Sequence, residues 1–181
     1  MSKDGIEERF LQVFTLAALQ AGSVALRLQG EVGLQTKAGQ RSPEGAALTA
    51  VDLAVQDLIL LLLLEYLPEV AVDAEEDTEL LSDFPRFDPN RALVVIDPVD
   101  GTLNYSSRSP DYAVMGSLIL NGYESASVVY FPSWGILYSA IKDKGSWYRD
   151  LRDKKGSQRL EIADLTSNEI LVPPRSFNAL Q

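Results

Sequence analysis

Residues 92–105 read ALVVIDPVDGTLNY and join an apolar run to an acidic turn. The run from Ala92 to Ile96 has no polar interruption, which indicates a buried strand. Because a buried strand presents its last side chain at a fixed place, we expect the carboxylate of Asp97 to be held rigidly. Pro98 fixes its own φ and biases Asp97 toward an extended conformation. Asp100 lies three residues after Asp97, and a turn between them can aim both carboxylates at one point.

The residues after this acidic pair favour an anion site. Gly101 permits a positive φ or a close approach of another backbone. If a helix begins near Thr102, the free amides of Gly101 and its neighbours can bind an anion beside the carboxylates. Such a site suits a phosphate bridged by Mg²⁺, which prefers a few carboxylates, waters and phosphate oxygens. A simpler alternative stays open, since Asp-Gly is a common turn signal and the stretch could merely end a strand.

Two further acidic clusters precede this stretch. The first is Thr49-Ala50-Val51-Asp52, at the expected start of a helix, and the second is Glu75-Glu76-Asp77, after a short apolar segment. Each has a plain alternative: the first could supply a helix cap and first-turn charge, and the second could be a solvated loop. The case for a site depends on the conjunction of three acidic groups, each at the end of an element.

Helical spacing of apolar residues dominates the N-terminal third of the chain. From Ile6 to about Leu28 this spacing predicts a long amphipathic helix. A second helix is predicted from about Ala47 or Leu48 to Leu67, where Pro68 closes it. Its residues Leu58 to Leu64 are apolar on every side, which implies burial against more than one neighbour. Residues 30–45 are rich in Gly, Ser and Pro and predict a loop.

Beyond Thr102 the pattern changes to strands and tight turns. Strands are predicted at 112–120, 126–131, 135–141 and 146–148, separated by Asn121-Gly122, Pro132-Ser133 and Asp143-Lys144-Gly145. Shorter strands are predicted at 70–72, 92–96, 160–162 and 170–172. These elements predict an α+β fold, in which two N-terminal helices pack on a largely antiparallel sheet.

Composition excludes several classes of function. The 181 residues include 16 basic and 26 acidic side chains, and the net charge of −10 opposes binding to nucleic acid. The chain has neither histidine nor cysteine, which excludes disulfides, zinc fingers, thiol nucleophiles and Ser-His-Asp triads. Catalysis would therefore depend on carboxylates, hydroxyls, lysines, backbone groups and hard metal ions. The longest apolar run is far shorter than the roughly 20 residues of a membrane span, so a cytoplasmic protein without a membrane partner is expected.

The series TAVD (49–52), AEEDTE (74–79) and IDPVDGTLNY (96–105), followed by apolar hairpins, resembles the magnesium-dependent, lithium-sensitive inositol monophosphatase family. That superfamily also contains 3′(2′),5′-bisphosphate nucleotidases and fructose-1,6-bisphosphatases. The resemblance covers about residues 6–165, and D-P-[IV]-D-G-T is its most specific element. It implies an N-terminal α+β lobe of the sugar-phosphatase fold at residues 1–165. Residues 166–181 would then be a strand-like tail that starts a C-terminal lobe.

The resemblance also implies roles for the matching residues. It assigns the metal ligands, for Mg²⁺, to Glu75, Asp97, the Val99 carbonyl and Asp100. It assigns catalysis to Glu75 and to the two residues that would orient the attacking water, Asp52 and Thr102. It assigns substrate binding to Asp100, Gly101 and Thr102. In this chemistry the metal ions lower the pKa of water, neutralise the phosphate and stabilise the departing alkoxide without a covalent intermediate.

Some features depart from the family pattern. Ala74 stands where the family usually has glycine, a mild change. Lys37 lies in a connection longer than the usual one, so it receives no role. The family's second lobe carries a W-D-x-A motif that completes the metal site, but neither Trp134 nor Trp147 is followed by aspartate.

The expected function is hydrolysis of a small sugar or cyclitol phosphate, such as inositol monophosphate, by a magnesium-dependent phosphomonoesterase. Asn104-Tyr105 after the Gly-Thr pair is more typical of inositol monophosphatases than of the nucleotidases. Two alternatives stay open: a 3′(2′),5′-bisphosphate nucleotidase, and a catalytically incomplete lobe that binds metal without turnover. The expected partners are a small phosphorylated metabolite and a second copy of the chain in a homodimer.

Overall fold

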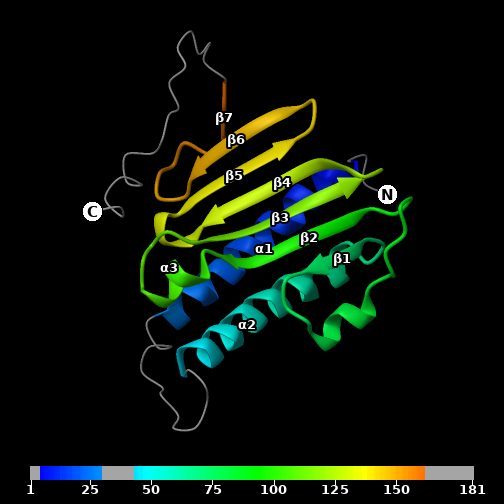
Figure 1. The fold of residues 1–181 in the computed structure, drawn as a ribbon. Helices are drawn as coiled ribbons and strands as arrows, with labels where there is room; N and C mark the ends of the chain where they lie inside the picture. The colour runs from blue at the N-terminus through cyan, green and yellow to red at the C-terminus, as the bar shows by residue number, and fades with distance from the viewer. Residues whose placement is uncertain (1–4, 30–42, 162–181) are drawn as a thin grey trace, which may run out of the picture.

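The computed structural model describes residues 5–29 and 43–161, with side chains from residue 50 onward in the second segment. Its centre is a seven-stranded sheet in the order β1-β2-β3-β4-β5-β6-β7 (Figure 1). The strands are β1 Ala71–Ala74, β2 Leu93–Asp100, β3 Ala113–Leu120, β4 Tyr123–Phe131, β5 Ile136–Ile141, β6 Gly145–Asp150 and β7 Gln158–Arg159. The helices are α1 Ile6–Gln29, α2 Pro43–Tyr66 and α3 Thr102–Ser106, with 3₁₀ turns η2 Glu79–Asp83 and η3 Pro132–Trp134.

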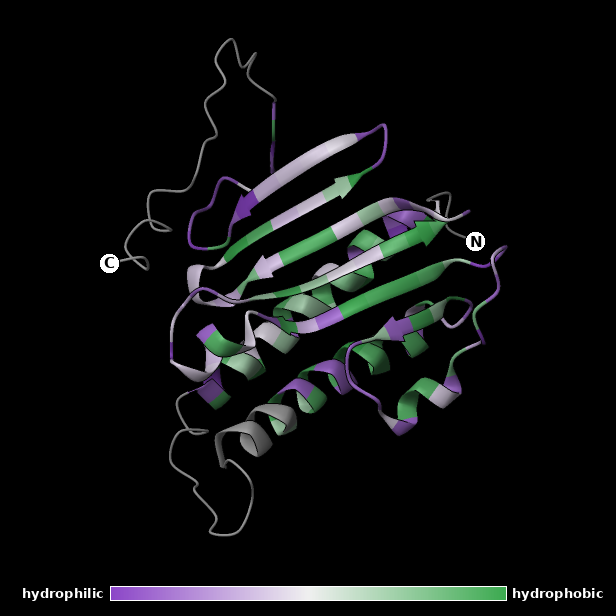
Figure 2. Ribbon diagram, viewed as in Figure 1, coloured by the Kyte–Doolittle hydropathy of each residue, from purple (hydrophilic) through white to green (hydrophobic). Residues whose placement is uncertain are grey.

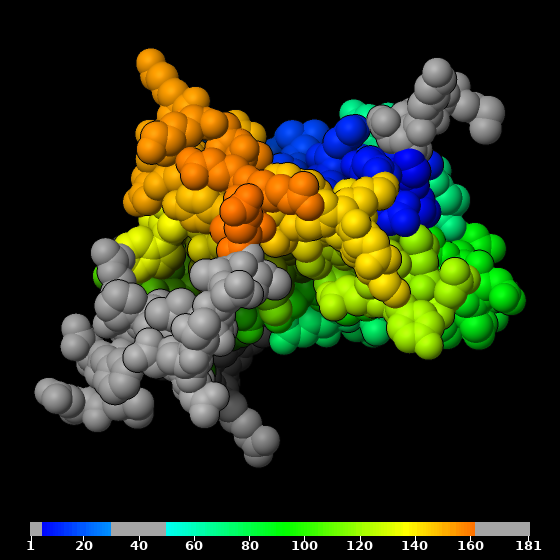
Figure 3. Space-filling view, turned by 90° about the horizontal axis from the view of Figure 1, so that it is seen from above, coloured from blue at the N-terminus to red at the C-terminus, as the bar shows by residue number. Residues whose placement is uncertain are grey.

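The sheet is antiparallel except for its first pair. β1 and β2 run parallel, and every later neighbour is antiparallel. Both long helices lie on one face of the sheet (Figure 1), and the view from above places α1 on one side of the β5–β6 edge (Figure 3). The predicted α+β fold, two helices on a largely antiparallel sheet, is confirmed.

α1 packs closely on the sheet because its inner face is made of small residues and two aromatic rings. The buried residues of α1 are Phe10, Phe14, Ala17, Ala18, Ala21, Gly22 and Ala25. A Cβ at Gly22 would lie 2.6 Å from the Tyr130 ring, so only glycine allows this approach. Among the described residues, α1 also has the length and apolar composition of a membrane span. A third of that apolar stretch is buried within the structure.

α2 begins earlier than predicted, at Pro43 within the expected loop. Proline is favoured in the first helical turn, where its missing N–H costs no hydrogen bond. The buried face of α2 includes Val55, Ile59 and Leu63. The predicted burial of residues 58–64 against more than one neighbour is confirmed, since α2 contacts α1, β2 and η2, although Leu61 is 53% exposed. α2 contacts the sheet and α1, and one row of its side chains faces outward.

Tight turns set the hairpins where the sequence predicts them. Asn121 and Gly122 both have positive φ, 53° and 78°, as a two-residue turn between right-twisted strands requires. The β4–β5 connection is the turn η3, which Gly135 ends in the left-handed region. The last strand starts earlier than the predicted 160–162: β7 is Gln158–Arg159, and the Leu160 N–H donates to the Ser146 carbonyl.

Hydropathy follows this layering (Figure 2). Green, hydrophobic residues run along most of β2 and β3, whereas β6, next to the short edge strand β7, is largely pale or purple. The green of β2 gives way to purple toward its C-terminal end, where the acidic turn begins. The predicted loop residues 30–42, Lys37, the predicted strand 170–172 and the predicted tail 166–181 lie outside the described residues.

Candidate active site

A bulge in β2 brings Asp97 and Asp100 to the same face of the sheet. Asp97 pairs with Met115 and Asp100 pairs with Ala113, so three steps along β2 oppose two steps along β3. Side chains alternate faces along a strand, and the extra residue therefore reverses the alternation between the two aspartates. The predicted strand 92–96 is too short, because β2 continues through this bulge to Asp100. The strand itself, rather than a turn after it, aims both carboxylates together.

The turn after the bulge depends on Gly101. It has φ 88°, in the left-handed region, and precedes the first residue of α3, Thr102. The Thr102 hydroxyl donates to the Val99 carbonyl at 3.3 Å, and the Val99 N–H donates to Asp97 Oδ1 at 3.2 Å. The helix expected near Thr102 is confirmed. These bonds connect the start of α3 to the bulge and to Asp97.

α3 is anchored by residues that the sequence analysis did not select. The buried hydroxyl of Tyr105 donates to the Ala25 carbonyl at 2.7 Å, and its ring packs edge-on to Tyr112 at 4.9 Å. Gln29 Nε2 donates to the carbonyls of Tyr105 and Ser109, at 3.2 and 3.0 Å. The C-terminal end of α1 therefore holds the short helix next to the acidic turn. No local pattern marks Gln29, because its partners lie more than seventy residues away.

Asp52 is a buried carboxylate on α2, with 7% of its surface exposed. Its Oδ1 atom has no hydrogen-bond partner within the described part of the chain. Burial raises the pKa of Asp52 from 3.8 to about 7, and the charges of Glu76, Glu75 and Asp97 add to the shift. Asp52 therefore lies within electrostatic range of both other acidic clusters.

Asp97 has a similar environment. Burial raises the pKa of Asp97 from 3.8 to about 7, with further contributions from the charge of Glu75, a hydrogen bond to its carboxyl, and the charge of Asp100. A hydrogen bond between two carboxyls requires a proton on one of them. The structure thus gathers Asp52, Glu75, Asp97 and Asp100, which come from α2, the loop after β1, and β2.

The loop that carries Glu75 is held by Gln56. This fully buried residue donates from Nε2 to the Glu76 carbonyl at 2.6 Å, and its Oε1 accepts from the Glu76 N–H at 2.9 Å. The sequence analysis missed Gln56. A usable signal was present, since Gln56 follows Asp52 by four residues and so lies on the same face of a helix.

The chemistry of this site fits a hard divalent cation. Every donor is a carboxylate, carbonyl or hydroxyl oxygen, and the unpartnered Asp52 Oδ1 and the mutual repulsion of the carboxylates favour a positive charge nearby. In residues 5–29 and 43–161 no group of three acidic side chains is already arranged to hold a metal ion. The hydrogen bond between Glu75 and Asp97 is consistent with this, because it turns the two carboxyls toward each other.

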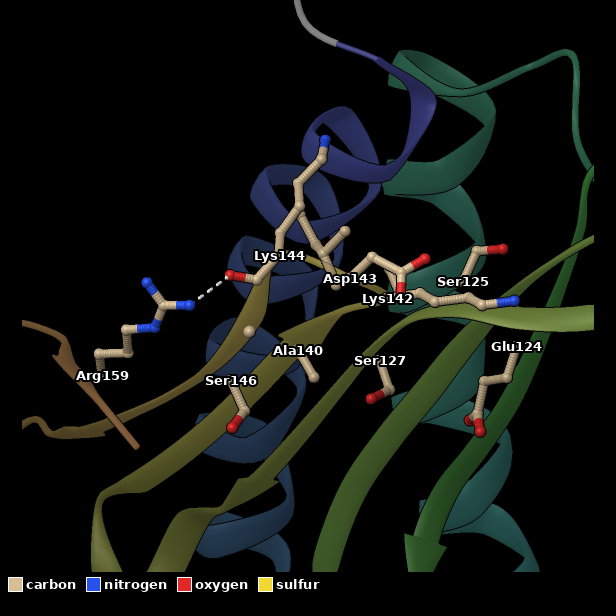
Figure 4. A pocket seen from close by; sticks show the side chains of 12 residues that line it. Glu124, Ser125, Ser127, Ala140, Lys142, Asp143, Lys144, Ser146 and Arg159 are labelled. Carbon is tan, nitrogen blue, oxygen red and sulfur yellow. Dashed lines mark hydrogen bonds between the residues drawn. The ribbon is translucent and has the colours of Figure 1, made fainter. Parts of the chain in front are cut away.

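A hollow lies elsewhere on the molecule, at the ends of β4, β5 and β6 (Figure 4). It has a volume of about 580 Å³ and is lined by serines and by Lys142, Lys144 and Arg159. These cations already have partners: Lys144 pairs with Glu8, Lys142 lies 5.2 Å from the Tyr123 ring, and Arg159 donates to the Lys144 carbonyl. Ala126 lines the hollow and pairs with Leu118, near the C-terminal end of β3. Ala113, which pairs with Asp100 of the acidic site, lies at the other end of β3. The hollow is therefore separate from the acidic site.

Comparisons with known proteins identify the family of the chain. Residues 7–176 match the model of the inositol monophosphatase family. Inositol monophosphatase 1 of Solanum lycopersicum is 29% identical over 170 residues, which are 94% of this chain and 60% of that protein. The 3′(2′),5′-bisphosphate nucleotidase CysQ of Escherichia coli (strain K12) is 30% identical over 118 residues, which are 64% of this chain and 45% of that protein.

A solved structure shares the fold. The inositol monophosphatase of Anabaena (Nostoc) sp. PCC 7120 matches with a TM-score of 0.56 and 28% identity, over 78% of this chain and 46% of that one. The chain thus spans 60% of the Solanum relative's length and less than half of the other two. The family match extends over nearly the whole chain and includes all three acidic clusters. The chain therefore belongs to the inositol monophosphatase family, a family of phosphatase-type hydrolases.

Proposed function

We propose that this chain forms the N-terminal lobe of a magnesium-dependent phosphomonoesterase that hydrolyses a small sugar or cyclitol phosphate such as inositol monophosphate. The observation that carries the proposal is the bulge in β2, which turns Asp97 and Asp100 to one face beside Asp52 and Glu75. Carboxylates gathered in this way suit divalent cations and the phosphates that such cations bind.

Four residues would hold Mg²⁺: Glu75, Asp97, the Val99 carbonyl and Asp100. The Val99 carbonyl accepts one hydrogen bond, from Thr102, and a carbonyl oxygen has a second lone pair for a cation. When bound, the metal would supply a water of lowered pKa and positive charge against the phosphate.

The chain's own residues would position the reactants. Asp52 and Thr102 would orient the attacking water, with Glu75 beside them. In the metal-free chain, burial raises the pKa of the Asp52 carboxyl well above its usual range. The amides of Gly101 and Thr102 would bind phosphate oxygens, since the first amides of α3 follow directly from the left-handed Gly101. Asp100 would contact the substrate.

The extent of the lobe is part of the proposal. Residues 1–165 would form the N-terminal lobe, and residues 166–181 would start the C-terminal lobe. The matched regions make up only 60% and 45% of the lengths of two relatives, which is compatible with this division. A second candidate is therefore a lobe that binds metal without turnover, because a missing ligand at a two-metal site could cost about 10³-fold in rate.

The relative CysQ favours a third candidate, a 3′(2′),5′-bisphosphate nucleotidase. Asn104-Tyr105 after the Gly-Thr pair supports the cyclitol phosphate instead, since this pattern is more typical of inositol monophosphatases. We further propose that the protein acts in the cytoplasm, is inhibited by lithium and forms a homodimer, with neither nucleic acid nor membrane as a partner.

The test is phosphate release by the 181-residue chain from inositol 1-phosphate, fructose 1,6-bisphosphate and 3′-phosphoadenosine 5′-phosphate, with Mg²⁺ and then with added Li⁺. Lithium-sensitive release from inositol 1-phosphate would support the main proposal, and preference for the bisphosphate nucleotide would support the nucleotidase. Magnesium binding without release would support the incomplete lobe. No magnesium binding would contradict all three.

A further inference from the structure

Gln56 has a polar environment that the proposed chemistry does not yet explain. Its side chain is completely buried in α2, one helical turn beyond Asp52. The amide makes two hydrogen bonds, both to the main chain of Glu76, at 2.6 and 2.9 Å. These bonds join α2 to the loop after β1, twenty residues further along the chain.

The pairing needs an amide. Gln56 donates to the Glu76 carbonyl and accepts from the Glu76 N–H, so one side chain satisfies both main-chain groups of a single residue. A methionine could do neither, and an ionised carboxylate could accept but not donate. Each of these bonds stabilises the loop, and leaving one partner unpaired would cost more than the bond contributes.

The location of the pairing matters because the surrounding charges repel one another. Glu75 and Glu76 both raise the pKa of Asp52, so the acidic loop is drawn against α2 in spite of like charges. Some contact must oppose that repulsion. The neutral amide of Gln56 does so without adding a charge, and it holds the residue adjacent to Glu75.

We propose that Gln56 is a positioning residue that holds the Glu75-Glu76 loop against α2 and thereby places the Glu75 carboxylate beside Asp52 and Asp97. This inference rests on the proposed function for the part that concerns Mg²⁺. Residues that orient metal ligands typically change metal affinity or activity by about 10–100-fold when they are replaced.

The experiment compares the 181-residue chain with Gln56→Met and Gln56→Glu. Isothermal titration gives the Mg²⁺ dissociation constant, and amide hydrogen exchange gives the protection of the Glu76 N–H. Gln56→Met should weaken Mg²⁺ binding by about 10–100-fold and remove the protection at Glu76. Gln56→Glu keeps the acceptor, and when protonated also the donor, so it should retain more affinity and more protection.

Ile59→Ala is the matched control for stability. Ile59 is fully buried on the same helix, and its truncation should lower stability by leaving a cavity, without removing a polar group. At a temperature where all variants are folded, the control should bind Mg²⁺ within about threefold of the parent chain. If it weakens binding as much as Gln56→Met, the role of Gln56 is general stability and the inference is wrong.

The two proposals fail in different ways. If the parent binds no Mg²⁺, the proposed metal chemistry fails, and protection at Glu76 still decides whether Gln56 holds the loop. If the parent binds Mg²⁺ and Gln56→Met binds it equally well, the positioning role is overturned while the proposed function stands. Should Gln56→Met not fold, Gln56→Leu, which also lacks both hydrogen-bonding groups, carries the same comparison, and unchanged exchange at Glu76 would overturn the inference.

Discussion

At Gly101 a single hydrogen atom in place of a side chain decides the geometry of the acidic turn. The φ of 88° is unfavourable for other residues, and a Cβ there would lie 3.0 Å from the Asp111 carbonyl oxygen. Gly101→Ala should therefore destabilise the fold by about 1–3 kcal/mol in urea denaturation. Gly122→Ala is the control, because Gly122 has φ 78° with no atom near its Cβ position. Equal losses at both sites would show that the contact with Asp111 is unimportant.

The proposed metal chemistry depends on the negative charge of a single side chain, the carboxylate of Asp97. Asp97→Asn keeps the shape but removes the charge, and it should abolish magnesium-dependent phosphate release in any active form of this protein. Phosphate release at saturating substrate over a series of Mg²⁺ concentrations measures the effect. Activity within tenfold of the parent would contradict the metal assignment of Asp97.

The raised pKa values of Asp52 and Asp97 predict a pH dependence of stability in the metal-free chain. Both shift from 3.8 to about 7, so the folded chain keeps protons that the unfolded chain loses near pH 4. Stability should therefore fall as the pH rises from about 4 to about 7 and then level off. Thermal unfolding in EDTA between pH 5 and 8 measures this.

One variant tests whether the two buried carboxyls cause this fall of stability with pH. Asp52→Asn removes one of the two protons and should flatten the fall in the unfolding midpoint. Asp83→Asn, at an exposed carboxylate of η2, should leave the slope unchanged. A midpoint of the parent that rises across the same pH range would show that the two carboxyls are not held as the structure places them.

At the scale of elements, α1 and β3 make a close contact between Phe14 and Gly116. A Cβ at Gly116 would overlap the ring of Phe14, which lies directly against the strand. Gly116→Ala should lower the free energy of unfolding by about 1–3 kcal/mol, because adding atoms to a densely packed core is destabilising. Chemical denaturation measures the loss, and Phe14→Leu in the same chain should restore part of it. A fully stable Gly116→Ala would mean that α1 can move away from the sheet at no cost.

Local sequence patterns predicted the helices and strands better than they predicted where these elements begin and end. Apolar spacing predicted both long helices, and the turn residues predicted the hairpins from β3 to β6. The ends of the elements were less accurate: α2 starts at Pro43 and β2 continues to Asp100. The predicted loop 30–45 included Pro43 and the predicted strand ended before Pro98, whereas proline is compatible with the first turn of a helix and with a bulge.

For the whole molecule, both long helices cover the same face of the sheet (Figure 1). On the opposite face Tyr138 is 38% exposed and packs against Phe131 and Tyr148, at 6.3 and 5.4 Å between ring centroids. If the proposed homodimer uses this face, a charge at its centre should weaken association. Sedimentation velocity should show a dimer for the parent and a larger share of monomer for Tyr138→Glu.

A matched variant tests whether that face is the one involved. Tyr123→Glu changes an aromatic residue that is 69% exposed at the β3–β4 turn, and it should leave the dimer intact. Sedimentation of the parent as a monomer at micromolar concentration would contradict the dimer. Equal effects of the two variants would place the interface elsewhere.

By itself the sequence determined the local features of this protein and the composition of its candidate site. Apolar spacing determined two helices, an uninterrupted apolar run determined the core of β2, and Asn121-Gly122 determined a hairpin turn. The three acidic clusters and the lack of histidine and cysteine determined a chemistry of carboxylates. All of these depend on interactions within a few residues, which a linear pattern contains.

Only the tertiary structure decided how these parts meet. The shared face of Asp97 and Asp100 depends on the register of β2 against β3, because a bulge is defined only by the partner strand. The pairing of Gln56 with Glu76 and that of Tyr105 with Ala25 join residues twenty and eighty positions apart. The exposure of Leu61 depends on which neighbours pack beside α2. These contacts form between distant segments, whose relative positions follow from packing of the whole lobe and not from local preference.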